Sequence, residues 1–121
     1  MPVNSKQKGA RGERAWRDVL RENGYEAHRA CQYSGKSPDG TSADVHSELP
    51  FHFEVKHCER WPIRDWIAQA KSDAERSGQP WVIAAKRNNA PFTVMMDAQT
   101  FFSVLRGDYA NEKNIKNSEI C

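Results

Sequence analysis

The pattern of hydrophobic and polar positions along the chain predicts three helices. Apolar and small side chains recur at helical spacing in residues 7–23, 64–77 and 98–106. Ser5 and Asp97 are residue types that cap helix starts, and glycine commonly takes the left-handed conformation that ends a helix. We therefore expect the three helices to end at Gly24, Gly78 and Gly107.

Between these helices, five segments have the alternating or continuous apolar pattern of strands. They are residues 25–33, 43–47, 50–58, 80–86 and 92–96. The element order is αβββαββα, which predicts a mixed α+β (α/β) domain with a central sheet of four or five strands. We expect one domain at 1–107 and a polar, frayed tail at 108–121.

Two of the expected strands form a hairpin whose register follows from its short loop. If Ser47 pairs with Phe51 across Glu48-Leu49-Pro50, the same register sets Asp44 opposite Glu54. Opposed side chains lie about 5 Å apart at Cβ, so the two carboxylates repel each other unless a cation lies between them. Mg²⁺ relieves such repulsion and commonly uses one or two protein carboxylates.

Strand alternation also assigns the faces of the second hairpin strand. Phe51, Phe53 and Val55 belong to one face, which we expect to be core. His52, Glu54 and Lys56 belong to the other face, which places the lysine beside the carboxylate pair. An ordinary polar sheet face is the competing interpretation of this triplet.

Glu13 is the third acidic candidate. It falls within the apolar stripe of the first helix, with Gly9, Trp16, Val19 and Leu20. A carboxylate there is costly unless it meets a cation or hydrogen-bond donors. We expect the hairpin site to be its partner. The functional interpretation requires the three acids to gather around a cation, so it would be overturned if they lay apart or if one of them had a permanent arginine partner.

Composition fits one folded domain with no membrane segment. Hydrophobic residues make up 38% and charged residues 28% of the 121 residues. No segment approaches the roughly 20 apolar residues of a membrane span, and the first residues lack the apolar core of a signal peptide, so we expect an intracellular, cytoplasmic protein. His57 and Cys58 are neighbours on a strand and point to opposite faces, so we set a zinc site aside.

The net charge of +2 is unevenly distributed, because Lys and Arg outnumber Asp and Glu in the first 36 residues. Arg11, Arg14, Arg17 and Lys36 are candidates for contacts with DNA backbone phosphates, and a solvated helix face explains them equally well. We expect Trp16, Trp66 and Trp81 in the core and His28, His52 and His57 in packing roles. Trp61, which precedes Pro62, is a candidate for contact with a substrate.

These residues resemble a known family. Glu13 in a G-x-R-x-E-R-x-W helix, Asp44, Glu54-Val55-Lys56 and Gln69 are similar in order and spacing to the motifs of the PD-(D/E)XK nuclease superfamily. The short chain and the Gly- and Arg-rich first helix look most like archaeal-type Holliday junction resolvases and related small phage endonucleases. The resemblance spans roughly residues 6–105.

The resemblance implies a restriction-endonuclease-like core and a catalytic site made of Glu13, Asp44, Glu54, Lys56 and Gln69. Asp44, Glu54 and the backbone carbonyl of Val55 would bind Mg²⁺, with Mn²⁺ as a substitute, and Glu13 would bind it directly or through water. Lys56 would orient the attacking water or stabilise charge on phosphorus, and Gln69 would hydrogen-bond nearby.

One departure from the family pattern leaves an alternative open. Ala43, not proline, precedes Asp44, whereas the Pro-Asp dipeptide of this chain is Pro38-Asp39. Asp39 is therefore a rival for the metal position. We prefer Asp44, because its ten-residue spacing to Glu54 fits a tight hairpin.

The resemblance predicts a Mg²⁺-dependent endodeoxyribonuclease, of phage type, that resolves four-way DNA junctions as a homodimer, in the host cytoplasm if the chain is phage-encoded. One alternative is a related nuclease that acts on flapped, single-stranded or duplex DNA. Another is a non-catalytic DNA-binding protein on a nuclease-like scaffold.

Overall fold

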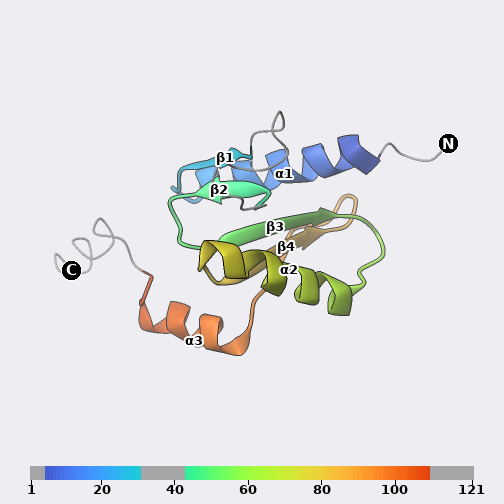
Figure 1. The fold of residues 1–121 in the computed structure, drawn as a ribbon. Helices are drawn as coiled ribbons and strands as arrows, with labels where there is room; N and C mark the ends of the chain where they lie inside the picture. Colours follow the sequence, from blue (N-terminus) through green and yellow to red (C-terminus); the bar gives the residue numbers. More distant parts are fainter. Residues whose placement is uncertain (1–4, 31–42, 110–121) are drawn as a thin grey trace.

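The computed structural model describes residues 5–30 and 43–109, which fold into three helices and one five-stranded sheet. The elements follow the expected order αβββαββα, and α1, α2 and α3 lie around the strands (Figure 1). No helix in these residues has the length and apolar character needed to cross a membrane. The elements are α1 (Ser5–Glu22), β1 (Ala27–Arg29), β2 (Val45–Ser47), β3 (His52–His57), α2 (Ile63–Ser77), β4 (Trp81–Lys86), β5 (Thr93–Met95) and α3 (Ala98–Arg106).

The sheet is mixed, and its strands lie side by side in sequence order, β1-β2-β3-β4-β5. β3 and β4 are parallel, with α2 as the crossover between them, and the other neighbours are antiparallel. Because β3 and β4 run in the same direction, their carboxyl ends meet at one edge of the sheet. Lys56 pairs with Ala85, and His57 pairs with Lys86 at this edge.

Two helices cover opposite faces of the sheet, and the alternation along β4 shows which residues each covers. Val82 and Ala84 belong to a core cluster with Trp16 and Leu20 of α1 and with Phe53 and Val55 of β3. Trp81, Ile83 and Ala85 belong to a second cluster with Trp66, Ala70 and Ala74 of α2. The central strands are therefore buried on both sides, and the expectation that these three tryptophans are core residues is confirmed.

The hairpin has the expected register, since Val45 pairs with Phe53. β1 begins later than predicted because Tyr25 belongs to the turn that ends α1. The backbone N–H of Tyr25 donates to the carbonyl of Leu20 at 3.0 Å, and this hydrogen bond holds Tyr25 in the turn. The remainder of the predicted first strand, after Ala30, lies outside the described residues, as does the predicted tail after Tyr109.

The predicted helix ends are confirmed. Gly78 has a φ of 70° and its N–H donates to the carbonyl of Ala74, which closes α2. Asp97 caps α3 by accepting a hydrogen bond from the backbone N–H of Thr100 at 2.8 Å. These local signals place both ends of α3 and the end of α2 as the sequence indicates.

The contact between α1 and β3 depends on Gly12, which is buried. A Cβ atom built on Gly12 would lie 2.7 Å from the Cβ atom of His57, which is closer than two carbon atoms can approach. Gly9, which the sequence pattern places in the apolar stripe, has no neighbour within 4 Å of such an atom. The close approach of α1 to the sheet therefore requires glycine at position 12.

We predict that Gly12→Ala destabilises the protein by about 1–3 kcal/mol, because α1 or His57 must move to admit the methyl group. Gly9→Ala is the matched control. It should raise the free energy of unfolding by about 0.5–1 kcal/mol, because alanine is the better helix former and meets no neighbour there. Urea denaturation of both variants measures the difference, and equal stability of the two would contradict the packing described.

Candidate active site

Asp44 and Glu54 come together because the hairpin register and one side-chain hydrogen bond hold Asp44 over β3. The backbone N–H of Asp44 donates to the carbonyl of Phe53 at 2.9 Å. Its carboxylate Oδ2 accepts a hydrogen bond from the backbone N–H of Val55 at 2.8 Å. Glu54, the residue between these two partners, is 5% exposed. The structure therefore brings together two of the acids that the sequence analysis singled out.

The environment of Asp44 opposes its ionisation. Burial, and after it the negative charge of Glu54, raises the pKa of Asp44 from its ordinary 3.8 to about 8. The N–H of Val55 and the charge of Lys56 act in the opposite direction, and the charge of Glu13 adds to the rise. The protein itself thus supplies too little positive charge to keep this carboxylate ionised at its ordinary pKa. A bound cation would supply that charge.

Glu54 is oriented by a buried histidine. Nε2 of His52 lies 2.9 Å from Oε1 of Glu54, and the histidine side chain is fully buried. Its Nδ1 lies 3.5 Å from the hydroxyl of Ser77, at the end of α2. That hydroxyl also donates to the carbonyl of Ala74 and accepts from the N–H of Gln79. The Glu54 carboxylate is therefore fixed to α2 through His52.

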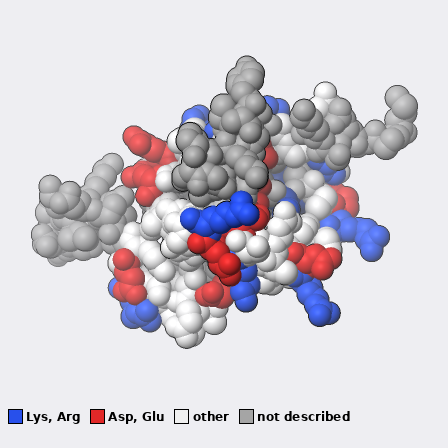
Figure 2. Space-filling model, viewed as in Figure 1, with Lys and Arg blue, Asp and Glu red and all other residues white. Residues whose placement is uncertain are grey.

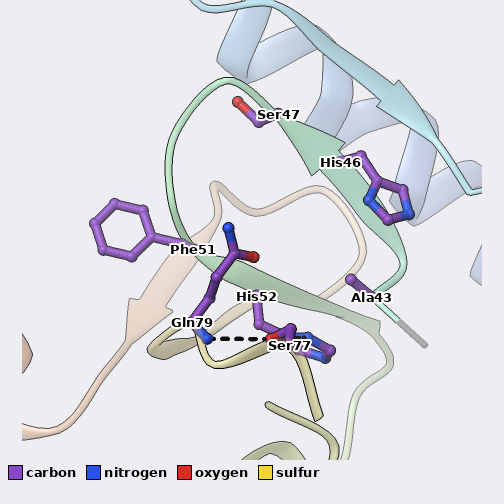
Figure 3. Close-up of a pocket in the computed structure, with 7 residues that line it drawn as sticks. All are labelled: Ala43, His46, Ser47, Phe51, His52, Ser77 and Gln79. Carbon is purple, nitrogen blue, oxygen red and sulfur yellow. Dashed lines mark hydrogen bonds between the residues drawn. The ribbon is translucent and has the colours of Figure 1, made fainter. Parts of the chain in front are cut away.

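The sequence analysis assigned His52 to packing and missed this orienting contact. The available signal was the spacing, because His52 and Glu54 are two residues apart on one strand face. Beside His52, a pocket of about 230 Å³ lies between β2 and the end of α2 (Figure 3). Figure 3 shows Ser77 and Gln79 next to the His52 ring, with His46 on the facing strand.

Lys56 lies on the same side of β3 as Glu54 and is half-buried. Its Nζ is 5.8 Å from the centroid of the Trp66 ring, so α2 limits where the ammonium group can go. Gln69 lies one turn after Trp66 on α2 and is exposed. No contact between Gln69 and the two carboxylates is present in residues 5–30 and 43–109.

Glu13 has an arginine partner. Nε and Nη2 of Arg29 both lie 3.1 Å from Oε1 of Glu13. The side chain of Glu13 is 17% exposed and that of Arg29 is 20% exposed. The cation that Glu13 contacts is the guanidinium group of Arg29 on β1. An arginine partner of one acid was expected to overturn the nuclease interpretation as a whole; it occurs at Glu13, where it counts against this residue as a metal ligand, and no arginine pairs with Asp44 or Glu54 in the described residues. The negative charge of Glu13 still acts on the site, because it raises the pKa of Asp44.

A divalent cation fits the pair formed by Asp44 and Glu54. No group of three or more His, Cys, Asp and Glu side chains that could hold a metal occurs in the part of the chain that the structure describes. Mg²⁺ commonly uses one or two protein carboxylates and keeps several water ligands, so Asp44 and Glu54 would form a sufficient donor set, and the raised pKa of Asp44 shows that this carboxylate lacks positive charge. Asp39, the rival of Asp44, and Lys36 lie outside the described residues.

Three of the four basic residues expected to contact DNA lie on α1, and Lys36 lies outside the described residues. Arg11 and Arg14 on α1 are exposed, and Arg17 pairs with Asp18 at 2.9 Å. On the face shown in Figure 2, acidic and basic side chains are interspersed and neither sign covers the surface. DNA contacts by these residues remain a prediction.

The structure has a mixed sheet between helices, with Asp44 on one arm of a hairpin and Glu54-Val55-Lys56 on the other. This arrangement is that of the PD-(D/E)XK class of nucleases. Residues 4–120 match the family described as "Phage putative PDDEXK endonuclease". The chain belongs to this family and is a nuclease of the PDDEXK type.

The fold has a solved counterpart. The structure of Hjc, a Holliday junction resolvase from the archaeal hyperthermophile Archaeoglobus fulgidus, matches with a TM-score of 0.55 and 24% sequence identity. The match covers 73% of this chain and 76% of that chain. It confirms the restriction-endonuclease-like fold predicted from the sequence. A search of the curated proteins finds no match.

The raised pKa of Asp44 predicts how stability depends on pH in the presence of a chelator. A carboxyl whose folded-state pKa lies near 8 stabilises the fold most below its ordinary pKa of 3.8, and this contribution is lost as pH rises through 8. The free energy of unfolding should therefore fall between pH 5 and 9, by at most about 1.4 kcal/mol per pH unit for one proton.

Asp44→Asn should remove this fall and make the protein more stable than the parent at pH 9. Urea denaturation at a series of pH values measures it. The matched control is Asp65→Asn, which changes an exposed carboxylate on α2 and should keep the parental pH dependence. If Asp44→Asn also keeps the parental dependence, Asp44 does not have the environment described.

Proposed function

We propose that this nuclease is a Mg²⁺-dependent endonuclease that resolves four-way DNA junctions. The observation that carries the proposal is the pair formed by the half-buried Asp44 and the buried Glu54 beside Lys56, in which the pKa of Asp44 is raised to about 8. Such a pair has a chemical use next to a phosphodiester only when a dication reduces the repulsion among the negative charges.

The chain's own residues divide the work. Asp44, Glu54 and the carbonyl of Val55 hold the cation, and His52 keeps the Glu54 carboxylate in place. Bound Mg²⁺ supplies positive charge at the phosphate and makes water a better nucleophile at neutral pH. Lys56 orients that water or stabilises the charge that develops on phosphorus, and Gln69 hydrogen-bonds at the rim of the site.

Glu13 acts through Arg29 in this proposal. Its ion pair puts a guanidinium group near the acidic site, where it can move between Glu13 and a substrate phosphate. Arg11, Arg14, Arg17 and Lys36 contact backbone phosphates further along the DNA. Such contacts position DNA without reading its sequence, which suits an enzyme that recognises the shape of a branch.

The junction as substrate rests on the similarity of fold to Hjc, which is itself a Holliday junction resolvase. The alternative within the same chemistry is a nuclease for flapped, single-stranded or duplex DNA. A non-catalytic DNA-binding protein is disfavoured, because buried carboxylates facing a phosphate weaken binding when no cation is used.

We predict that the parent cuts a synthetic four-way junction with Mg²⁺, and that Mn²⁺ substitutes for it, whereas Ca²⁺ or a chelator leaves the junction intact. A linear duplex of the same sequence should be cut more slowly. Gel assays of end-labelled strands measure both rates. Equal rates on the two substrates would favour the duplex nuclease, and cleavage in chelator would contradict the metal role.

Asp44→Asn and Glu54→Gln should lower the cleavage rate at least about 100-fold, because each removes a charge that holds the cation. DNA binding should stay intact or become tighter, since less negative charge faces the phosphates. Lys56→Ala should slow cleavage without changing the Mg²⁺ concentration for half-maximal rate. The control is Glu75→Gln, an exposed acid on α2. Parental rates in either acid variant would overturn the assigned ligands.

Paired cleavage of a junction requires two active sites, and we propose that α3 joins two copies of the chain. Thr100 of this helix is buried, whereas four apolar side chains point outward, which is the reverse of an ordinary surface helix. In Figure 2, the surface over α3 is mostly uncharged. The exposed fractions are 49% for Phe101, 51% for Phe102, 42% for Val104 and 66% for Leu105.

The apolar side chains along β5 are the other candidate for this interface, and we favour α3. Phe92 and Met96, which flank β5, pack against the core cluster on the α1 side of the sheet. Val94 is 44% exposed and adds to the apolar surface that α3 presents. A two-fold dimer that buries this surface removes it from water and places two sites in one assembly.

We predict that Phe102→Glu and Leu105→Glu convert a dimer into a monomer in analytical ultracentrifugation. On a junction, the monomer should nick single strands and produce few paired cuts. Gln99→Glu changes an exposed side chain of the same helix by the same charge, and it should leave the dimer intact. A parent that sediments as a monomer at micromolar concentration would contradict this interface.

A further inference from the structure

A pocket next to the candidate active site has the composition of a site for an unpaired base. The loop from β3 to α2 and the residue after β4 enclose a volume of about 640 Å³, here called the aromatic pocket. This volume lies within the range of small-molecule sites. Its lining is Cys58, Glu59, Arg60, Trp61, Pro62, Trp66 and Arg87. Oε1 of Glu59 accepts a hydrogen bond from the backbone N–H of Asn88 at 2.8 Å.

The stacking groups of the aromatic pocket are held in place by the backbone. The indole N–H of Trp61 donates to the carbonyl of Cys58 at 2.9 Å. The guanidinium of Arg87 lies 4.0 Å from the centroid of the Trp61 ring, and its Nε–H donates to the carbonyl of Glu59 at 3.2 Å. A flat ring and a flat cation are thus already stacked before any ligand arrives, which lowers the entropy cost of binding.

The aromatic pocket lies close to Lys56. The centroid of the Trp66 ring, which lines the pocket, is 5.8 Å from Nζ of Lys56 and 5.9 Å from the centroid of the Trp61 ring. Both Lys56 and Arg87 lie at the carboxyl ends of the parallel strands, β3 and β4, so they share one edge of the sheet. A nucleotide next to the cleaved phosphate can therefore reach Trp61.

A second pocket at the same edge carries positive charge. It has a volume of about 400 Å³ and is here called the basic pocket. The two pockets are lined by consecutive residues of the chain, since Arg87 lines the aromatic pocket and Asn88 lines the basic pocket. Oδ1 of Asn88 lies 3.1 Å from Nε2 of His57. The lining of the basic pocket is Lys8, Arg11, His57, Lys86, Asn88 and Asn89.

We propose that the aromatic pocket binds an unpaired base beside the cleaved phosphodiester and that the basic pocket binds the adjoining backbone phosphates. This inference rests on the proposed function and deepens it, because it names a base unpaired at the branch point as the feature recognised. Bases stack on tryptophan faces and on guanidinium planes, and every base has such a face, so the contact is tolerant of sequence. A base inside a duplex is paired and stacked and cannot enter.

The test uses oligonucleotides that contain the fluorescent base 2-aminopurine, in chelator so that no strand is cut. Stacking on Trp61 quenches this fluorophore. We expect quenching with a single strand, and with a junction labelled at the branch, but not with the same base in the middle of a duplex. Anisotropy titrations on the same samples give the affinities.

Trp61→Ala should abolish the quenching and weaken single-strand binding about tenfold, the loss typical of one stacked base. Duplex affinity should change less than twofold. Trp61→Phe should retain most of the binding, and Arg87→Ala, which leaves the Trp61 ring in place, should weaken it separately. Tyr109→Ala is the matched control, because it removes a ring that contacts Phe51 and lines neither pocket.

Parental quenching and affinity in both Trp61→Ala and Arg87→Ala would overturn the proposal, and so would an equal loss on duplex and single strand. The thermal midpoint of each variant excludes unfolding as the cause. This test is independent of cleavage. If the parent fails to cut any DNA with Mg²⁺ but still quenches 2-aminopurine, the proposed function fails and the base pocket stands.

Discussion

The hydrogen bond from the backbone N–H of Val55 to the Asp44 carboxylate is the interaction on which the site depends. It fixes an acidic group over the strand that carries Glu54 and Lys56, at a depth where burial raises the pKa of Asp44 to about 8. The hairpin register makes this contact possible, since Val45 opposite Phe53 places Asp44 one step before the pair. A shift of one residue would turn Asp44 to the other face of the sheet, and the pair of acids would be lost.

Each of the three acids has a protein partner on one oxygen, and the partners are of three chemical kinds, two from β3 and one from β1. Asp44 accepts from the backbone of β3, Glu54 faces His52, and Glu13 is held by Arg29 of β1. The partners differ in what they imply. A backbone N–H and a histidine orient a carboxylate and leave it available for a cation, whereas arginine neutralises it. We therefore regard Asp44 and Glu54 as the cation-binding pair and Glu13 as a group that positions Arg29.

The parts of the structure that the sequence predicted are those set by local chemistry. Asp97 caps α3 and Gly78 ends α2 because a side-chain acceptor and a left-handed residue act within one turn. The hairpin register follows in the same way from a short loop. The contacts that could not be predicted join distant segments. Arg29 meets Glu13 only because β1 packs along α1, and Gly12 is required only because α1 passes so close to His57. Periodicity marks a buried face but does not identify the residue on the opposing element.

The parallel pairing of β3 and β4 explains why cleavage and DNA binding can share one edge. Lys56 lies two residues after Glu54, near the carboxyl end of β3, and residues at and beyond the ends of these two strands line the aromatic and basic pockets. In Figure 1, α3 lies away from the carboxyl end of β3. A dimer formed through α3 would leave this edge open on both copies, so each could hold one arm of a branched substrate. The two proposals are therefore compatible in space, because the surface proposed to join the copies is not the surface proposed to bind DNA.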